Sequence, residues 1–315
     1  MARIALVLVL ALVAVGLAGD GAARRAAAVL FNGDFETGSY TPWPTPQCSN
    51  YGYTLGQNGA IANFGPFYVE RAGVRTHAGD VVPAGQGNYF GAFTVPADMQ
   101  HKQRCQVMYK RTGSFSTDDY YSLMIYVPVG WDPGNPTWGV SFFEPNYQQN
   151  LAVNSAKALA LTLRPDAPGD RTHDHVTLNM TTGFDNATQP YFTNASDADN
   201  PAGCRGVLLP CKLYAIPPGA FRQGVWNEII VHDRWATSNT GVVETWYRQK
   251  GQTAWTKSVS LANVPTLQYD ATHDGKGPVL EGISNYRAPA STQETVYFDG
   301  YTRATTFDAA AAELP

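Results

Sequence analysis

The amino-acid sequence predicts an all-β, antiparallel fold of the sandwich or jelly-roll type, and three observations support this prediction. Short strand-like runs recur along the chain, no segment of helical length has a convincing 3.6-residue period, and Gly and Pro punctuate the runs. The 315 residues include 30 Gly and 21 Pro, with 12% aromatic and 15% charged residues. This composition suits one large β domain that is rich in turns.

Residues 1–28 have the pattern of a secretory signal peptide. Arg3 precedes an apolar run over residues 4–17, and small residues stand at Ala26 and Ala28. The apolar run is shorter than the ~20 residues that a membrane-spanning helix needs. We therefore expect a secreted, extracellular protein that has no membrane association once the signal is removed.

The mature chain is expected to form a single domain over residues 29–308, followed by a loose tail over residues 309–315. No internal repeat and no linker divides it. The formal net charge of −4 gives no general attraction to polyanions, so nucleic acid is not expected as a partner. Basic groups that bind an acidic substrate would have to be concentrated in one cleft. We expect a monomer without an organic cofactor.

Four cysteines in an exported chain favour disulfides over metal thiolates. Cys204 and Cys211 are separated by six residues and can close a small loop, which leaves Cys48 and Cys105 as the second pair. Four cysteines allow three connectivities, and proximity in the sequence is the only guide among them. None of the four lies in a Cys-x-x-Cys pattern, so they do not indicate a zinc or redox site.

Six strands are predicted between residues 89 and 179. They cover Tyr89–Val95, Gln103–Arg111, Tyr120–Val127, Thr137–Phe143, Ala158–Leu163 and His175–Asn179. Residues 181–221 are irregular and rich in Asn, Asp, Pro and Gly. A long loop of this kind either carries a function, such as a wall or lid over a cleft, or is merely ornamental.

A long hairpin is predicted over Gly224–Trp235 and Gly241–Tyr247. Apolar and polar side chains of the first strand alternate with period two, so that Ile229 faces a core and His232 lies on the other face. The β-branched and aromatic residues of the second strand suit a pleated sheet. His232 is expected to make a cross-strand surface contact with Glu244.

Several segments resemble the jelly-roll polysaccharide lyases, the group that includes heparin-lyase-like, glucuronan-lyase-like and alginate-lyase-like proteins. They are Trp-Asn-x-Ile-x-Val-His-x-x-Trp over residues 226–235 with Gly-Val-x-Glu-x-Trp over residues 241–246, the opening segment Phe31–Gly38, and the closing segments Gly282–Arg287 and Val296–Gly300. Together they bracket nearly all of the mature chain. The resemblance implies a concanavalin-like two-sheet sandwich and an enzyme that cleaves an acidic, uronic-acid-containing polysaccharide by β-elimination.

β-Elimination requires neutralisation of the C5 carboxylate, removal of the C5 proton and protonation of the departing O4. Cationic or amide side chains suit the first task, and His or Tyr within hydrogen-bond reach suits the proton transfers. A strand after His101 would place Lys102, Arg104 and Gln106 on one face. The resemblance matches Arg104 to the arginine of an Arg-x-Glu element that contacts substrate, in which Gln106 replaces the acid. The alternative is an ordinary solvated strand face.

Tyr286 corresponds in the resemblance to the catalytic tyrosine of a Lys-x-Gly-x-Tyr strand. Two extra residues separate it from the Gly-Ile pair that begins at Gly282, and Leu280 stands in the place of the lysine. We expect Arg104 to neutralise the carboxylate and Tyr286 and His101 to transfer protons. A packing role is the alternative for Tyr286.

The family's Gln-x-His pair has no counterpart in the expected central strand at Trp138–Asn146. Glu144 and Asn146 stand there instead and are expected, with Lys102 and Gln106, to bind substrate. The missing pair favours a second hypothesis, a non-catalytic carbohydrate-binding jelly-roll module that has lost the lyase residues. A hydrolase would need a close carboxylate pair on one strand face, and none is evident.

The remaining histidines are alternative proton carriers. His77 could enter a cleft from an early loop. His173 and His175 flank Asp174, which looks like a metal-ligand pattern, but we expect a loop that enters a strand.

A structural calcium ion is a further expectation, because resembling sandwiches often hold one between the first and last strands. Asp34, Glu36 and Asp299 offer hard oxygen ligands in the corresponding segments. We expect these three side chains to bind one Ca²⁺ that takes no part in the chemistry. Ordinary turn capping is the alternative.

Aromatic side chains are the remaining cue, because their faces can stack against sugar rings. The candidates are Tyr40, Trp43, Trp131, Trp138, Tyr147 and Trp255. Burial in a large sandwich is the alternative for each.

Overall fold

The structure is a computed structural model of the chain, and its described part has several gaps. It comprises residues 29–44, 47–51, 60–63, 68–76, 79–100, 102–111, 118–133, 139–147, 156–157, 159–167, 170, 173–180, 213–236, 238, 240–264, 266 and 279–315. The predicted signal peptide, His77, His101, Trp138, Cys204 and Cys211 lie outside these residues.

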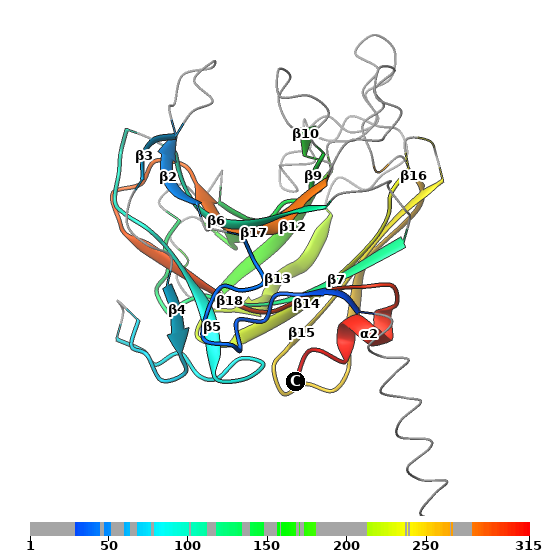
Figure 1. Cartoon of the computed structure of the whole chain (residues 1–315), viewed down its shortest axis with the longest axis horizontal. Coiled ribbons are helices and arrows are strands. Elements are labelled where there is room, and N and C mark those ends of the chain that lie inside the picture. The colour runs from blue at the N-terminus through cyan, green and yellow to red at the C-terminus, as the bar shows by residue number, and fades with distance from the viewer. Residues whose placement is uncertain are drawn as a thin grey trace, which may run out of the picture.

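Two antiparallel sheets stack as a sandwich in the described part of the chain, with β6 and β17 in one layer and β14 and β15 in the other (Figure 1). The eight-stranded sheet comprises, in spatial order, β16 (Thr256–Val264), β15 (Gly241–Gln249), β14 (Trp226–Arg234), β7 (Asp118–Tyr126), β18 (Glu294–Ala304), β5 (Tyr89–Val95) and β4 (Tyr68–Arg71), with β1 (Val29–Asn32) paired to β18.

The ten-stranded sheet forms the second layer. It comprises, in spatial order, β13 (Tyr214–Arg222), β12 (His173–Met180), β11 (Leu159–Pro165), β8 (Val140–Phe143), β17 (Val279–Arg287), β6 (Lys102–Arg111), β2 (Gln47–Tyr51) and β3 (Ala60–Asn63), with β9 (Asn146–Tyr147) and β10 (Ala156–Lys157) off this path. The predicted antiparallel jelly-roll sandwich is confirmed.

Most of the strands predicted from the sequence pattern are present at or near the predicted residues. β5 has the predicted bounds, and the hairpin is β14 with β15, in which His232 lies directly opposite Glu244. One expectation was wrong. His173 and Asp174 belong to β12 rather than to a loop before it, because His173 pairs with Arg222 on β13 and Asp174 pairs with Pro165 on β11, whereas His175 lies in a strand as predicted.

The main hydrophobic core lies between the two sheets and takes in aromatic residues expected to bind sugar. Trp43 and Trp131 are only 3% and 2% exposed and belong to this core, so the stacking prediction is wrong for both. The Trp43 indole Nε1 donates a hydrogen bond to the Gly33 carbonyl oxygen at 3.0 Å, which satisfies its polar atom inside the core. Tyr40 is 41% exposed, whereas Trp255 packs against a second apolar cluster.

This second cluster corrects the prediction of a loose C-terminal tail. Residues Phe307–Ala311 form the helix α2, which the Thr306 side chain caps by accepting a hydrogen bond from the Ala309 amide. Ala309, Ala310 and Leu314 are buried against the outer face of the eight-stranded sheet. The tail is ordered because its small and apolar side chains cover apolar groups such as Trp246 on β15.

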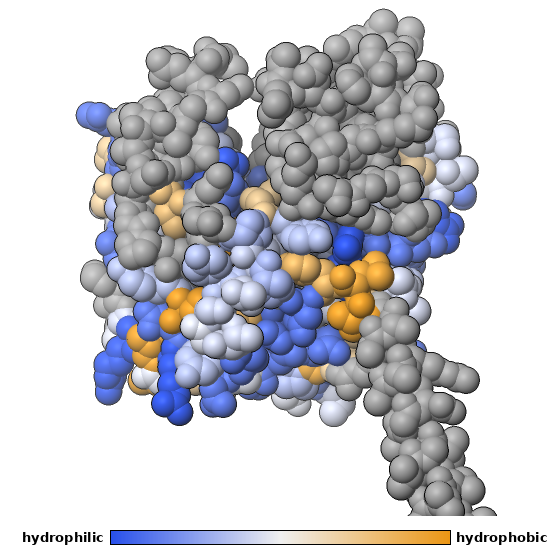
Figure 2. Space-filling model, viewed as in Figure 1, coloured by the Kyte–Doolittle hydropathy of each residue, from blue (hydrophilic) through white to orange (hydrophobic). Residues whose placement is uncertain are grey.

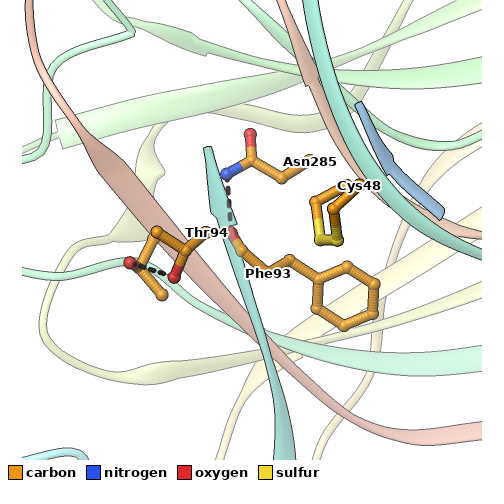
Figure 3. The surroundings of a disulfide bond; sticks show 6 residues. Cys48, Phe93, Thr94 and Asn285 are labelled. Atoms are coloured by element: carbon orange, nitrogen blue, oxygen red, sulfur yellow. Dashed lines mark hydrogen bonds between the residues drawn. A yellow bond between two sulfur atoms is a disulfide. The ribbon is translucent and has the colours of Figure 1, made fainter. Parts of the chain in front are cut away.

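A disulfide joins Cys48 on β2 to Cys105 on β6, two residues that lie directly opposite each other (Figure 3). This pair was predicted, and it is confirmed. The Phe93 ring lies beside the disulfide in the core, and Asn285 Nδ2 donates to the Phe93 carbonyl oxygen at 2.8 Å. β17 is thereby linked to β5 of the opposite sheet.

The described surface in the view of Figure 2 is mainly hydrophilic, with several small hydrophobic patches. Small scattered apolar patches are ordinary on protein surfaces. Within the described residues, no helix has both the length and the apolar character needed to cross a membrane.

Candidate functional site

A row of polar side chains crosses the face of the ten-stranded sheet that points away from the core. Successive side chains of a strand point to opposite faces of the sheet. Because Cys105 on β6 and Leu163 on β11 point into the core, the residues next to them in sequence point to the other face. On that face, five residues from five adjacent strands lie directly opposite one another in sequence across the sheet. From β6 through β17, β8 and β11 to β12 they are Arg104, Tyr286, Ser141, Thr162 and Thr177. We call these residues, together with Lys102, Gln106, Ser284, Arg164 and His175, the polar face.

Arg104 and Tyr286 form the pair with the clearest chemical potential. They lie directly opposite each other on β6 and β17, and the Arg104 guanidinium carbon is 5.6 Å from the centroid of the Tyr286 ring. Both side chains are partly exposed. The guanidinium has a planar fork that matches a carboxylate.

Hydrogen bonds from the core side hold β17 in place behind Tyr286. Asn285 bonds to β5 as described above, and Arg287 Nε donates to Gln103 Oε1 at 3.0 Å. Arg287 Nη2 donates to the Pro96 carbonyl oxygen at 2.9 Å. Arg287 is fully buried, so it points away from Tyr286, as strand alternation predicts.

Polar side chains also tie β17 to its other neighbours on the polar face. Ser284 Oγ donates to the Ser141 carbonyl oxygen at 3.0 Å, and the Ser141 and Thr162 hydroxyls lie 3.3 Å apart. Thr177 Oγ1 is 3.4 Å from the Thr162 carbonyl oxygen. These contacts join the strands next to Arg104 and Tyr286 on the polar face. They hold the side chains of this face in fixed positions before any ligand binds.

Positive charge is concentrated on the polar face although the chain is acidic overall. The partly exposed Lys102 and Arg104 on β6 carry it, whereas Arg164 on β11 is only 5% exposed. Such a local concentration attracts an anionic chain in spite of a formal net charge of −4. Of the expected substrate-binding residues, Gln106 and Glu144 are 6% and 3% exposed. The backbone of Asn146 lies in β9, but its side chain is outside the description.

Sequence reasoning missed two residues of the polar face, Arg164 and His175. Arg164 lies one residue beyond the predicted end of its strand, and His175 begins the predicted strand His175–Asn179 but was not placed in the site. Both could have been found by continuing the alternation of Leu159, Leu161 and Leu163 along β11 and by pairing β11 with the next strand.

The three acids expected to bind calcium lie near one another, but they are occupied by amide donors. Glu36 accepts hydrogen bonds from the Asn88 and Tyr89 amides, and Asp299 accepts them from the Gln86 and Gly300 amides. Burial, together with the negative charges nearby, raises the pKa of Asp299 well above its usual value.

The third acid, Asp34, accepts hydrogen bonds from the Glu36 amide and the Asn32 side chain. Across the described ranges, no group of three or more His, Cys, Asp or Glu side chains is arranged to hold a metal ion. Calcium binding therefore stays a prediction. The prediction is tested by comparing the melting temperature of the protein in the presence of calcium with that in the presence of a chelator.

The hairpin residues that resemble the lyases belong to the opposite sheet and have structural partners. His232 Nδ1 is 2.9 Å from Glu244 Oε2, and its Nε2 is 3.2 Å from Asp118 Oδ1. The His232 ring stacks on Tyr120 with centroids 4.1 Å apart. These contacts join β14, β15 and β7 on the outer face of the eight-stranded sheet, away from the polar face.

No protein-family model and no curated protein matches the sequence. Among solved structures, the chain is similar to an endo-β-1,4-glucuronan lyase from the fungus Trichoderma reesei, with a TM-score of 0.53 and 13% identity over 90% of this chain and 98% of that chain. An alginate lyase from Aplysia kurodai has a TM-score of 0.42 and 10% identity, covering 84% and 100% of the two chains.

Lectin II from Ulex europaeus has a TM-score of 0.35 and 10% identity, covering 82% and 98% of the two chains. The likeness to the alginate lyase and to the lectin is weaker than that to the glucuronan lyase. The chain thus has a jelly-roll fold, which its likeness to the fungal glucuronan lyase supports.

Proposed function

We propose that the protein is a secreted polysaccharide lyase that cleaves an acidic, uronic-acid-containing polysaccharide by β-elimination. The observation that carries this proposal is the in-register pair of Arg104 and Tyr286 on a cationic sheet face. The jelly-roll fold shared with a glucuronan lyase supports it. The disulfide between Cys48 and Cys105 is typical of oxidising compartments and supports export.

In the proposed mechanism, Arg104 binds the C5 carboxylate of the sugar and neutralises it, which makes the adjacent C5 proton more acidic. The Tyr286 phenolate takes the C5 proton. The electron pair of the broken C5–H bond forms the C4=C5 double bond, and the C4–O4 bond breaks. O4 then takes up a proton, which the Tyr286 hydroxyl can return, so that the tyrosine regains its starting state.

The discriminating experiment is an ultraviolet absorbance assay for the unsaturated uronate product. The protein is incubated with glucuronan, alginate and heparin-type polymers, and absorbance is followed over time. We expect a rise with at least one polymer and none with a neutral polysaccharide of similar length. No rise with any of these acidic polymers, combined with measurable binding, would contradict the proposal.

A non-catalytic carbohydrate-binding module is the second candidate. The observation that favours it lies on β8, which stands beside β17 where the resembling lyases have a Gln-x-His pair. Here Ser141 is the β8 residue opposite Tyr286. Isothermal titration with the same polymers detects binding without cleavage, which is the result that this candidate requires.

A further inference from the structure

The pair of Arg104 and Tyr286 lies one step from the end of the ladder between β6 and β17. The next pair, Gln103 with Arg287, is the last in the register of these two strands. Local opening costs least free energy at the ends of elements. The separation of the two proposed site residues therefore depends on how firmly this end of the ladder is closed.

The last pair of the ladder is joined through its side chains, inside the core. Gln103 and Arg287 are both 0% exposed, and Arg287 Nε donates a hydrogen bond to Gln103 Oε1 at 3.0 Å. Because successive side chains of a strand point to opposite faces of the sheet, this bond lies on the face opposite to Arg104 and Tyr286. It joins the two strands one residue away from the site pair.

Arg287 is also bonded to the backbone of two segments that connect the sheets. Its Nη2 donates to the Pro96 carbonyl oxygen at 2.9 Å and to the Thr292 carbonyl oxygen. Pro96 follows β5 and Thr292 precedes β18, and both of these strands belong to the eight-stranded sheet. The guanidinium thus ties the end of the β6–β17 ladder to the opposite layer. We call Arg287 and Gln103 the ladder-end clamp.

Stability alone does not account for a guanidinium in this position. Taking the group out of water is costly, and well-packed apolar side chains of similar volume are often at least as stable. Burial lowers the pKa of Arg287 to about 10, with the negative charges of Glu294 and Asp132 opposing the shift, so the group is charged at neutral pH. What the charged fork adds is direction, because its N–H groups hold several acceptors at fixed positions.

We infer that Arg287 and Gln103 are positioning residues for Tyr286. Their bond on the core side holds the ends of β6 and β17 together and so keeps the Tyr286 ring at its 5.6 Å distance from the Arg104 guanidinium carbon. A displacement of ~1 Å at a reacting group can cost about 100-fold in rate. This inference rests on the proposed function for its catalytic readout, and it assigns no substrate contact to either residue of the clamp.

The test removes both partners of the clamp in the double variant Gln103→Met, Arg287→Met. Replacing both partners of a buried hydrogen bond by apolar groups of similar shape is nearly neutral for stability, so the midpoint of urea unfolding should stay close to that of wild type. The kcat measured in the ultraviolet assay should nevertheless fall about 10- to 100-fold, with KM changed by less than about threefold. Wild-type kcat in this variant overturns the inference.

Two further comparisons separate positioning from a general structural effect. Gln103→Glu keeps an oxygen acceptor for Arg287 and should retain most of the activity that Gln103→Met loses. In a Tyr286→Phe background, the double substitution should change kcat by less than about threefold, because the clamp acts through the tyrosine hydroxyl. An equal loss in both backgrounds contradicts the inference. If the double variant does not fold, the two single variants at Gln103 decide, and equal kcat values for them contradict it.

Gln249→Met is the matched control. Gln249 is the last residue of β15, in the other sheet, and its half-buried side chain donates from Nε2 to the Ala220 carbonyl oxygen at 3.1 Å. This variant therefore also removes one side-chain hydrogen bond at the end of a strand, and it should keep wild-type kcat. A loss equal to that in Gln103→Met would show that any lost bond of this kind lowers activity, which rules out a specific clamp.

Failure of the proposed function gives a different result. If wild-type protein forms no unsaturated product, amide hydrogen exchange tests the clamp without catalysis. Among residues 103–105 and 285–287, the amides that bond across the β6–β17 ladder should exchange about 10- to 100-fold faster in Gln103→Met than in wild type. Those near Val107 and Ile283, in the middle of the ladder, should be unchanged. Equal exchange at the end of the ladder in both proteins contradicts the inference.

Discussion

Each residue of the polar face lies beside the residue directly opposite it on the neighbouring strand. Its possible chemical role therefore depends on that partner. Arg104 has a defined partner only because β6 and β17 are in the register that sets it against Tyr286. The same register sets Cys105 against Asn285 on the core side. A shift of one residue between these strands would exchange the two sets, which would bury the charges and expose the core residues.

The first prediction concerns the hydroxyl of Tyr286. Tyr286→Phe removes one oxygen and keeps the ring that contacts Arg104, so the fold and substrate binding should be preserved. Because the hydroxyl carries the proposed proton transfers, kcat should fall by roughly 10²- to 10⁴-fold with little change in KM. The ultraviolet assay measures both. Tyr40→Phe, at an exposed tyrosine, is the control and should retain full activity. Activity of Tyr286→Phe within a few-fold of wild type would rule out this role.

At the scale of elements, the strand that carries Arg104 depends on its neighbours for its position. β6 is held between β17 and β2, and the disulfide links it covalently to β2. On the opposite sheet, α2 and the residues after it cover the outer faces of β14 and β15. Both features lie outside the proposed chemistry, and both are expected to contribute to stability.

The second prediction tests the disulfide. The cross-link closes a sequence separation of 57 residues, for which the chain-entropy model gives a stabilisation of about 4 kcal/mol. The double variant Cys48→Ser, Cys105→Ser should therefore unfold at clearly lower denaturant concentration. Equilibrium unfolding in urea measures the difference. An unchanged midpoint would show that pairing of β2 with β6 constrains the chain without the cross-link.

The third prediction tests the C-terminal segment. Leu314 is 7% exposed within the apolar cluster that includes Trp246, and the Pro315 carbonyl oxygen accepts a hydrogen bond from Arg248 at 2.7 Å. Leu314→Ala should cost about 2 kcal/mol of unfolding free energy because it opens a cavity. Leu30→Ala, at an exposed leucine, should change it by less than about 0.5 kcal/mol. Equal effects of the two variants would restore the view of a loose tail.

At the scale of the whole molecule, several carboxyl groups are buried, and they make stability depend on pH. Burial raises the pKa of Asp174 to about 8, with the Gln223 hydrogen bond opposing the shift and the negative charges of Asp166 and Asp170 adding to it. Burial likewise raises the pKa of Glu294 to about 7, against the opposing charge of Arg287.

The fourth prediction follows from the sign of these shifts. An unfolded aspartate has a pKa of about 3.9, so the folded protein binds the Asp174 proton more tightly. The stabilisation is complete below about pH 4 and is lost as pH rises toward 8, by an amount on the order of 5 kcal/mol at most. Wild type should therefore lose more stability than Asp174→Asn between pH 5 and pH 8.5 in parallel urea titrations. Parallel pH profiles for the two proteins would contradict the proposed protonation of Asp174.

The sequence alone determined the class of fold, because strand alternation and turn composition are local properties. The hairpin of β14 and β15, the contact of His232 with Glu244 and the bounds of β5 all followed from period-two patterns. Arg104 and Tyr286 were named as candidates from motif resemblance, although more than 180 residues separate them along the chain.

Only the tertiary structure decided which residues share one surface. It set Arg104 against Tyr286, added Arg164 to the same face, and moved Trp43 and Trp131 from candidate sugar platforms into the core. It also ordered the C-terminal segment against β14 and β15. These outcomes depend on strand order and register between segments far apart in sequence. A local pattern shows which face of a strand is polar, but not which other strand lies beside it.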